Sequence, residues 1–227
     1  MMNKDITEWG KYVSGDVPKN AFTSETLNKI DGLGSNDIRD FIQLYILESI
    51  PRFIIDRPFI YNAVRRHIVK NIGLTDNDYN VVYLTGSAQL GFSLHPTKER
   101  KSFNPKTSDL DFFIVSPKLF GELKTVFEQW GKEPEKKDKQ SERAYETSKK
   151  NLQSGFFQIL QLSPRYKHVI KYLKMEETTL NFINYLLKES LTEPFSIKKI
   201  SFRVYKNYDA AINQIKLNIE YFIKCAR

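Results

Sequence analysis

Apolar residues recur along the chain at two spacings, one typical of helices and one typical of strands. Apolar positions three or four residues apart predict helices, which fall over residues 36–50, 58–72, 117–130, 165–188 and around Ile212 to Phe222. Compact strand-like runs occupy 81–84, 109–115 and 197–205. This order of helices and strands predicts an α+β fold, in which a small mixed β-sheet is flanked by helices from both ends of the chain.

The first strand-like run ends in a glycine and a serine. Val81–Leu84 is apolar, Gly86 and Ser87 break the run, and a helix-compatible stretch continues to Phe92. Glycine lets a backbone approach a ligand closely, and the free N–H groups at a helix start attract phosphate oxygens. The pattern predicts a turn in which Gly86 and the Ser87 hydroxyl hold phosphate, although an isolated Gly-Ser pair is also a common turn.

The second run begins with two acids, Asp109 and Asp111. Side chains alternate along a strand, so both carboxylates are expected on one face, with Leu110, Phe112 and Ile114 on the other. Two such carboxylates can bridge a pair of Mg²⁺ ions about 3.5–4 Å apart, as in nucleotidyl transfer. Turn chemistry with a solvated acid pair is the alternative for this motif alone.

Taken together, the two motifs resemble those of the DNA polymerase β-type nucleotidyltransferase superfamily, and the match covers Val81 to Val115. The resemblance implies a nucleotidyltransferase core in which Gly86 and Ser87 hold the phosphates of a nucleoside triphosphate (NTP). It also implies that Asp109 and Asp111 bind Mg²⁺ or Mn²⁺. The amino-acid sequence of both segments also resembles that of small bacterial or phage nucleotidyltransferase-like proteins, which suggests a bacterial defence or toxin–antitoxin setting.

The chain departs from that family in two places. The spacer from Ala88 to Ser108 is longer than usual and includes the polar, basic stretch 96–107, which implies an inserted loop. The family usually places a third acid on a later strand, whereas the run Ile200–Tyr205 has none. Asp209 follows that run and reads better as an N-cap of the last helix. Two functions therefore stay open: an active enzyme, or a nucleotide- or nucleic-acid-binding sensor that has lost turnover.

The charge of the chain favours a polyanionic partner. A net charge of +8 and a pI of about 9.3 suit nucleotide phosphates or RNA, or simply a soluble lysine-rich surface. In the inserted loop, Lys98, Arg100, Lys101 and Lys106 are candidates for phosphate contacts, with ordinary surface charge as the alternative. The acceptor hydroxyl could belong to an RNA 3′ end, a protein side chain, a small molecule or a second nucleotide, and the charge favours RNA.

Composition bounds the remaining classes. A hydrophobic content of 41% excludes wholesale disorder, and the single Cys225 excludes an internal disulfide. No apolar run is long enough to cross a membrane and no signal-peptide core is evident, so a cytoplasmic protein with no membrane partner is expected. His67 lies on an apolar helical stripe and is expected to pack between helices rather than to act in catalysis.

The chain divides by composition into four parts. A polar arm is expected over residues 1–35, and the nucleotidyltransferase core with its leading helices over 36–130. A densely charged segment over 131–151 predicts a solvated helix or a mobile loop, interpreted as a linker or flap. The part over 152–227 is expected to be helical, with a final strand and helix that complete the core.

Overall fold

A computed structural model of the protein describes residues 35–54, 57–74, 81–94, 101–132, 139–162, 167–190 and 195–226. The predicted polar arm over 1–35 lies outside these ranges except for its last residue. None of the helices in the described ranges is long and apolar enough to cross a membrane.

In the part of the chain that the structure describes, four strands form one mixed sheet in the order β1-β2-β4-β3. The strands are β1 (Val82–Thr85), β2 (Leu110–Val115), β3 (Phe156–Gln158) and β4 (Ile200–Tyr205). β2 is antiparallel to β1 and parallel to β4, and β3 is antiparallel to β4. The predicted small mixed sheet is therefore present, with β3 as an additional strand that the apolar pattern did not indicate.

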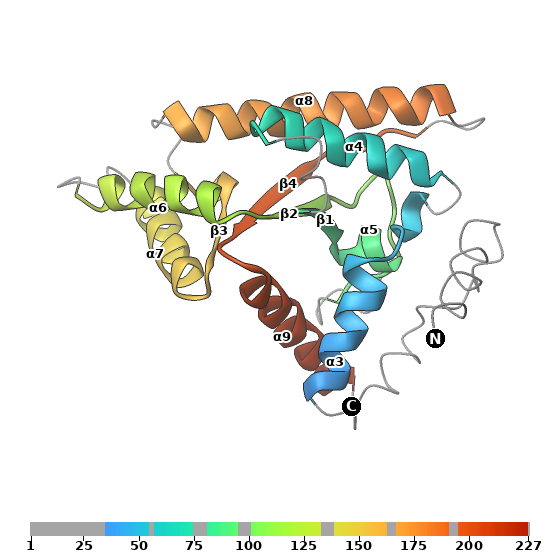
Figure 1. Ribbon diagram of the computed structural model, residues 1–227, viewed down its shortest axis with the longest axis horizontal. Helices are drawn as coiled ribbons and strands as arrows, with labels where there is room; N and C mark the ends of the chain where they lie inside the picture. Colours follow the sequence, from blue (N-terminus) through green and yellow to red (C-terminus); the bar gives the residue numbers. More distant parts are fainter. Residues whose placement is uncertain are drawn as a thin grey trace.

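Helices cover both faces of this sheet, so the fold is α+β, as predicted (Figure 1). One face carries α4 (Pro58–Asn71) and α8 (Lys167–Ser190), which lie side by side, together with α6 (Pro117–Gly131). The other face carries α9 (Tyr208–Ala226) and α3 (Ser35–Ile42), which continues into a π-helical turn over Gln43–Leu47. The short α5 (Gly86–Leu90) follows β1, and α7 (Lys139–Gln153) precedes β3.

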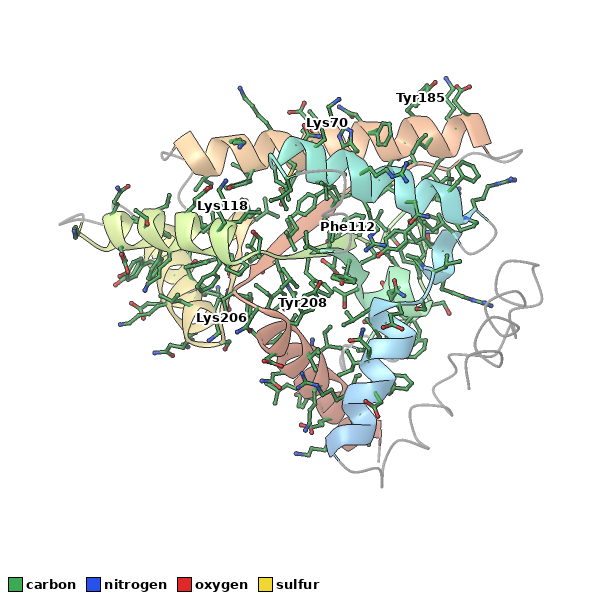
Figure 2. All side chains as sticks on the ribbon, viewed as in Figure 1. Lys70, Phe112, Lys118, Tyr185, Lys206 and Tyr208 are labelled. Atoms are coloured by element: carbon green, nitrogen blue, oxygen red, sulfur yellow. The ribbon has the colours of Figure 1, made fainter. Side chains whose placement is uncertain are left out.

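The alternation of side chains along β2 produces the two cores. Leu110, Phe112 and Ile114 pack beneath α4, α6 and α8, as the sequence predicted, and Figure 2 shows Phe112 in the interior. Phe113 and Val115 point the other way and pack against α3 and α9. The carboxylate positions at the start of β2 share this second face.

Most of the segment expected to be a linker or flap forms a helix that packs on the core in the part that the structure describes. Residues 139–153 form α7, and the Tyr145 ring stacks on Phe127 with centroids 4.7 Å apart and meets Trp130 at 5.3 Å. Ser148 is only 1% exposed. A narrow stripe of Ala144, Tyr145 and Leu152 packs against the core. The apolar spacing of this stripe is hard to detect in the sequence because the other faces of the helix are densely charged. Residues 133–138 lie outside the described ranges.

The cap of α9 also differs from the expectation. Asn207, rather than Asp209, holds the helix start, because its Oδ1 accepts from the Ala210 N–H at 2.9 Å. Asp209 lies in the first turn and forms an ion pair with Arg39 of α3 at 2.6 Å. This exposed ion pair joins α3 to α9.

Candidate functional site

The structure brings the Gly-Ser turn and the second aspartate together. Thr85, the last residue of β1, is the register partner of Asp111 in β2, and Gly86 follows directly. Gly86 has φ +71°, and a Cβ at this position would lie 3.1 Å from Asp111 Oδ2. The left-handed backbone and the close carboxylate both call for glycine here.

A hydrogen-bonded turn delivers Asp109 to the same sheet face. Asn104 Oδ1 accepts from the Lys106 N–H at 2.9 Å, and the Asn104 carbonyl accepts from the Ser108 N–H at 2.7 Å. The Ser108 hydroxyl in turn accepts from the Asn104 N–H at 3.1 Å. Asp109 follows this turn and Asp111 lies two residues further, so both project from one face of the sheet.

The spacer between the motifs leaves and returns through paired backbone. The Ser93 N–H donates to the Lys101 carbonyl at 2.9 Å, and the Phe103 N–H donates to the Gly91 carbonyl at 2.8 Å. Lys101 and Lys106 are exposed on the returning side. Lys98 and Arg100 lie outside the described residues.

Ser201 is a site residue that sequence reasoning missed. It is the register partner of Asp111 on β4, and its hydroxyl donates to Asp111 Oδ1 at 2.7 Å. Ser201 is 4% exposed, so the hydroxyl fixes the carboxylate from inside the fold. Ser201 and Arg203 are the two polar residues of the otherwise apolar run Ile200–Tyr205, but the partner of Ser201 depends on the β2–β4 register.

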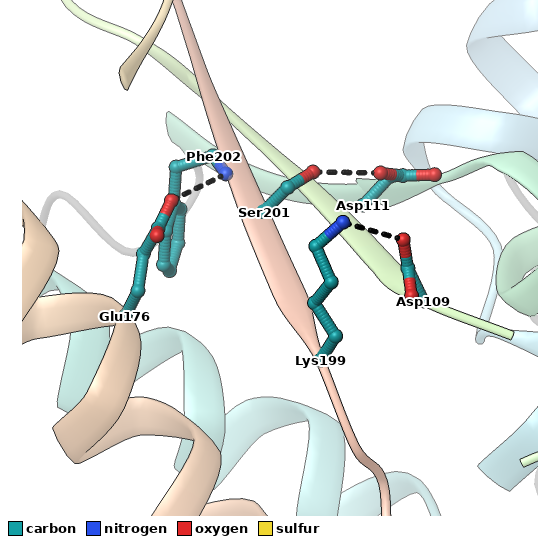
Figure 3. Close-up of polar contacts among 6 residues, drawn as sticks. All are labelled: Asp109, Asp111, Glu176, Lys199, Ser201 and Phe202. Atoms are coloured by element: carbon teal, nitrogen blue, oxygen red, sulfur yellow. Dashed lines mark hydrogen bonds and ion pairs between the residues drawn. The ribbon is translucent and has the colours of Figure 1, made fainter. Parts of the chain in front are cut away.

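Lys199 is the second missed residue. Its Nζ lies 3.2 Å from Asp109 Oδ2, and both side chains are largely exposed (57% and 42%). The Leu110 N–H donates to the Lys199 carbonyl at 3.0 Å, which sets the two strands side by side where they begin. Asp111 is thus held by a neutral hydroxyl, while Asp109 faces a cation (Figure 3).

Glu176 of α8 is near these residues but does not join the acid pair. Its Oε1 accepts from the Phe202 N–H at 3.2 Å, on the side of β4 away from Asp109 and Asp111 (Figure 3). Burial raises the pKa of Glu176 to about 7, and the hydrogen bond from Phe202 and the charge of Lys199 oppose that rise. Its carboxyl group accepts the hydrogen bond of a β4 backbone N–H and does not join Asp109 and Asp111.

The donor set suits one hard divalent cation better than two. Carboxylate and hydroxyl oxygens are ligands that Mg²⁺ accepts. Because Gly86 has no side chain, the space next to Asp111 Oδ2 on that side is left open. Within the described ranges, no three His, Cys, Asp or Glu side chains gather as a metal-binding group. The residue opposite Asp111 on the neighbouring strand β4 is Ser201.

Two other sequence candidates have definite positions. Ser87 lies in the first turn of α5, where Thr85 is the N-cap and makes no side-chain cap bond. His67 stacks on Phe182 of α8 with ring centroids 4.4 Å apart, in agreement with a packing role, and burial lowers the pKa of His67.

Comparisons of the chain with protein-family models, with curated proteins and with solved structures found no match.

Proposed function

We propose that this protein binds an NTP together with Mg²⁺ or Mn²⁺ and transfers its nucleoside monophosphate to a hydroxyl acceptor. The observation that carries the proposal is the contact between the Gly86 turn and Asp111, with 3.1 Å from the Cβ position to Oδ2. A phosphate held at this turn would lie directly against the carboxylate pair. Phosphate and a divalent cation are thus expected to share one small region of the sheet face.

Each residue has a distinct role in this proposal. Asp109 and Asp111 hold the cation through their oxygens, and Ser201 orients Asp111. The N–H groups at Gly86 and the Ser87 hydroxyl hold phosphate oxygens. When bound, the cation neutralises charge on the transferred phosphate and on the departing pyrophosphate. An RNA 3′ end is the first acceptor to test, because the net charge is +8, and a protein side chain is the second.

The experiment supplies each labelled NTP with Mg²⁺ or Mn²⁺ and follows the label into RNA, protein or a free product. Asp109→Asn and Asp111→Asn should each abolish turnover, since each removes a negative ligand and keeps the shape of the side chain. Asp40→Asn, at an exposed position of α3, is the matched control and should keep full activity. Near-normal turnover in either site variant would show that the metal assignment is wrong.

Ser201 and Lys199 favour a second candidate, a nucleotide sensor without turnover. A serine rather than a third acid lies opposite Asp111, and a lysine neutralises Asp109. A sensor would bind the NTP in a metal-dependent manner and release no pyrophosphate. Binding measured beside a pyrophosphate-release assay separates the two functions.

A further inference from the structure

Lys199 lies within the candidate site, and its position is set by the backbone. The Leu110 N–H donates to the Lys199 carbonyl at 3.0 Å, which keeps residue 199 beside the residue that precedes β2. From there its ammonium reaches Asp109 Oδ2 at 3.2 Å. The proposed metal ligand therefore already has a cation from the chain itself.

Stability does not account for this ion pair. Both side chains are largely exposed, and an exposed lysine–carboxylate pair contributes little to folding because water screens it. The long, flexible stem of lysine also allows the ammonium to leave Asp109 without any change in the sheet. The pair can thus open at low cost when another charged group arrives.

We infer that Lys199 is a ligand-coupling residue: its ammonium competes with a divalent cation for Asp109, and a bound triphosphate relieves this competition by drawing the ammonium onto its phosphate oxygens. The inference rests on the proposed function and adds the reason why metal and nucleotide would bind together. Two cations at one carboxylate repel each other, so metal alone binds weakly. Because coupling is reciprocal, bound metal also favours the triphosphate.

The inference predicts opposite effects of Lys199→Met on two ligands. Without nucleotide, the variant should bind Mn²⁺ about tenfold more tightly than the wild type, because the competitor is gone. With a chelator present, it should bind inorganic tripolyphosphate about tenfold more weakly, because a phosphate contact is lost. The disappearance of the electron paramagnetic resonance signal of free Mn²⁺ measures the first affinity, and calorimetry measures the second.

The control is Lys198→Met, at the neighbouring exposed position. It makes the same change in net charge, so any general electrostatic effect appears in both variants. A second test compares the single variant Asp109→Asn with the double variant that carries both Asp109→Asn and Lys199→Met. In the Asp109→Asn background the lysine substitution should no longer alter Mn²⁺ affinity, because the two residues act through one contact.

Each result has a defined meaning. If Lys199→Met shifts both affinities no more than Lys198→Met does, or if its effect on Mn²⁺ persists without Asp109, the inference is overturned and the proposed function stands. If the wild type binds neither Mn²⁺ nor tripolyphosphate at millimolar concentrations, both the proposed function and the inference are overturned. Opposite shifts that are specific to residue 199 support the inference.

Discussion

Ser201 lies directly opposite Asp111 across the β2–β4 pair. An acid at this buried position would place like charges directly across two strands, which is unfavourable unless a cation lies between them. The hydroxyl avoids that repulsion and gives Asp111 a donor at 2.7 Å. In the absence of metal, Asp111 is therefore more stable beside Ser201 than it would be beside a third carboxylate at that position.

This contrast predicts the behaviour of Ser201→Asp. With a chelator present, the variant should lose roughly 2 kcal/mol of stability, from like-charge repulsion and from the lost hydrogen bond. Added Mn²⁺ should restore most of this loss and bind more tightly than to the wild type, since three carboxylates then share the cation. Thermal unfolding with and without Mn²⁺ measures both effects. Ser201→Asn has the same size without the charge and should show no recovery with Mn²⁺.

Glu176 predicts a pH dependence of stability. Burial raises its pKa to about 7 from 4.5, so the folded protein retains the proton to higher pH than the unfolded chain does. Its contribution is fully present below pH 4.5 and is lost as pH rises through about 7. Glu176→Gln keeps an oxygen acceptor for the Phe202 N–H, but its side chain has no proton that titrates in this pH range.

Glu176→Gln should therefore be more stable than the wild type at pH 8 and nearly equal to it at pH 4, as measured by urea unfolding. Glu177→Gln, at the exposed neighbouring position, should follow the wild type throughout. Parallel pH curves for the wild type and Glu176→Gln would show that this carboxylate titrates normally in the folded protein.

At the scale of elements, the turn between β1 and α5 connects the fold to the site. Gly86→Ala would force a side chain into a left-handed backbone and to 3.1 Å from Asp111 Oδ2. We expect a loss of roughly 1–3 kcal/mol of stability and weaker Mn²⁺ binding, because Asp111 must move. Gly121→Ala in α6 is the control, since nothing lies within 4 Å of its Cβ position. It should stabilise the protein by roughly 0.5–1 kcal/mol.

The elements that the sequence predicts well are those with a long local pattern. The alternation through β2 and the helical spacing of α4, α6, α8 and α9 each extend over enough residues to show their period. β3 has only three residues, which is too short to show an alternating pattern. The apolar stripe of α7 is narrow, and the charged residues around it conceal its helical spacing. Short range is the common limit in these cases.

The candidate site divides in the same way. Gly86, Ser87, Asp109 and Asp111 lie in two contiguous motifs, and their order along the chain sufficed to single them out. Ser201 and Lys199 reach the acids only through the pairing of β2 with β4, which lie about 90 residues apart in the chain. Register is a non-local property, so no local pattern identifies either residue as part of the site.

At the scale of the whole molecule, the site joins three segments: the turn after β1, the start of β2 and the start of β4. A ligand that contacts all three binds only the folded protein, and at 100 times its Kd it adds about 2.7 kcal/mol of stability. For a chain of this length that is a rise in Tm of roughly 5–10 °C.

Each NTP with Mg²⁺ should be tested in this way by differential scanning fluorimetry, with Asp111→Asn beside the wild type. The cognate NTP should raise the Tm of the wild type and leave that of Asp111→Asn nearly unchanged. An equal rise in both proteins would place the nucleotide elsewhere on the molecule.

The strand order has a consequence for how the protein is made. β4 pairs with both β2 and β3, although it follows both of them in the chain. During translation, β1 and β2 can pair and pack against α4, α6 and α8 before β4 is made, but the strand that joins β2 to β3 is absent until residues 200–205 have left the ribosome. Until then the acid pair has no serine or lysine partner and an apolar edge is uncovered. Nascent chains that stop before β4 are therefore expected to need chaperones or to be degraded.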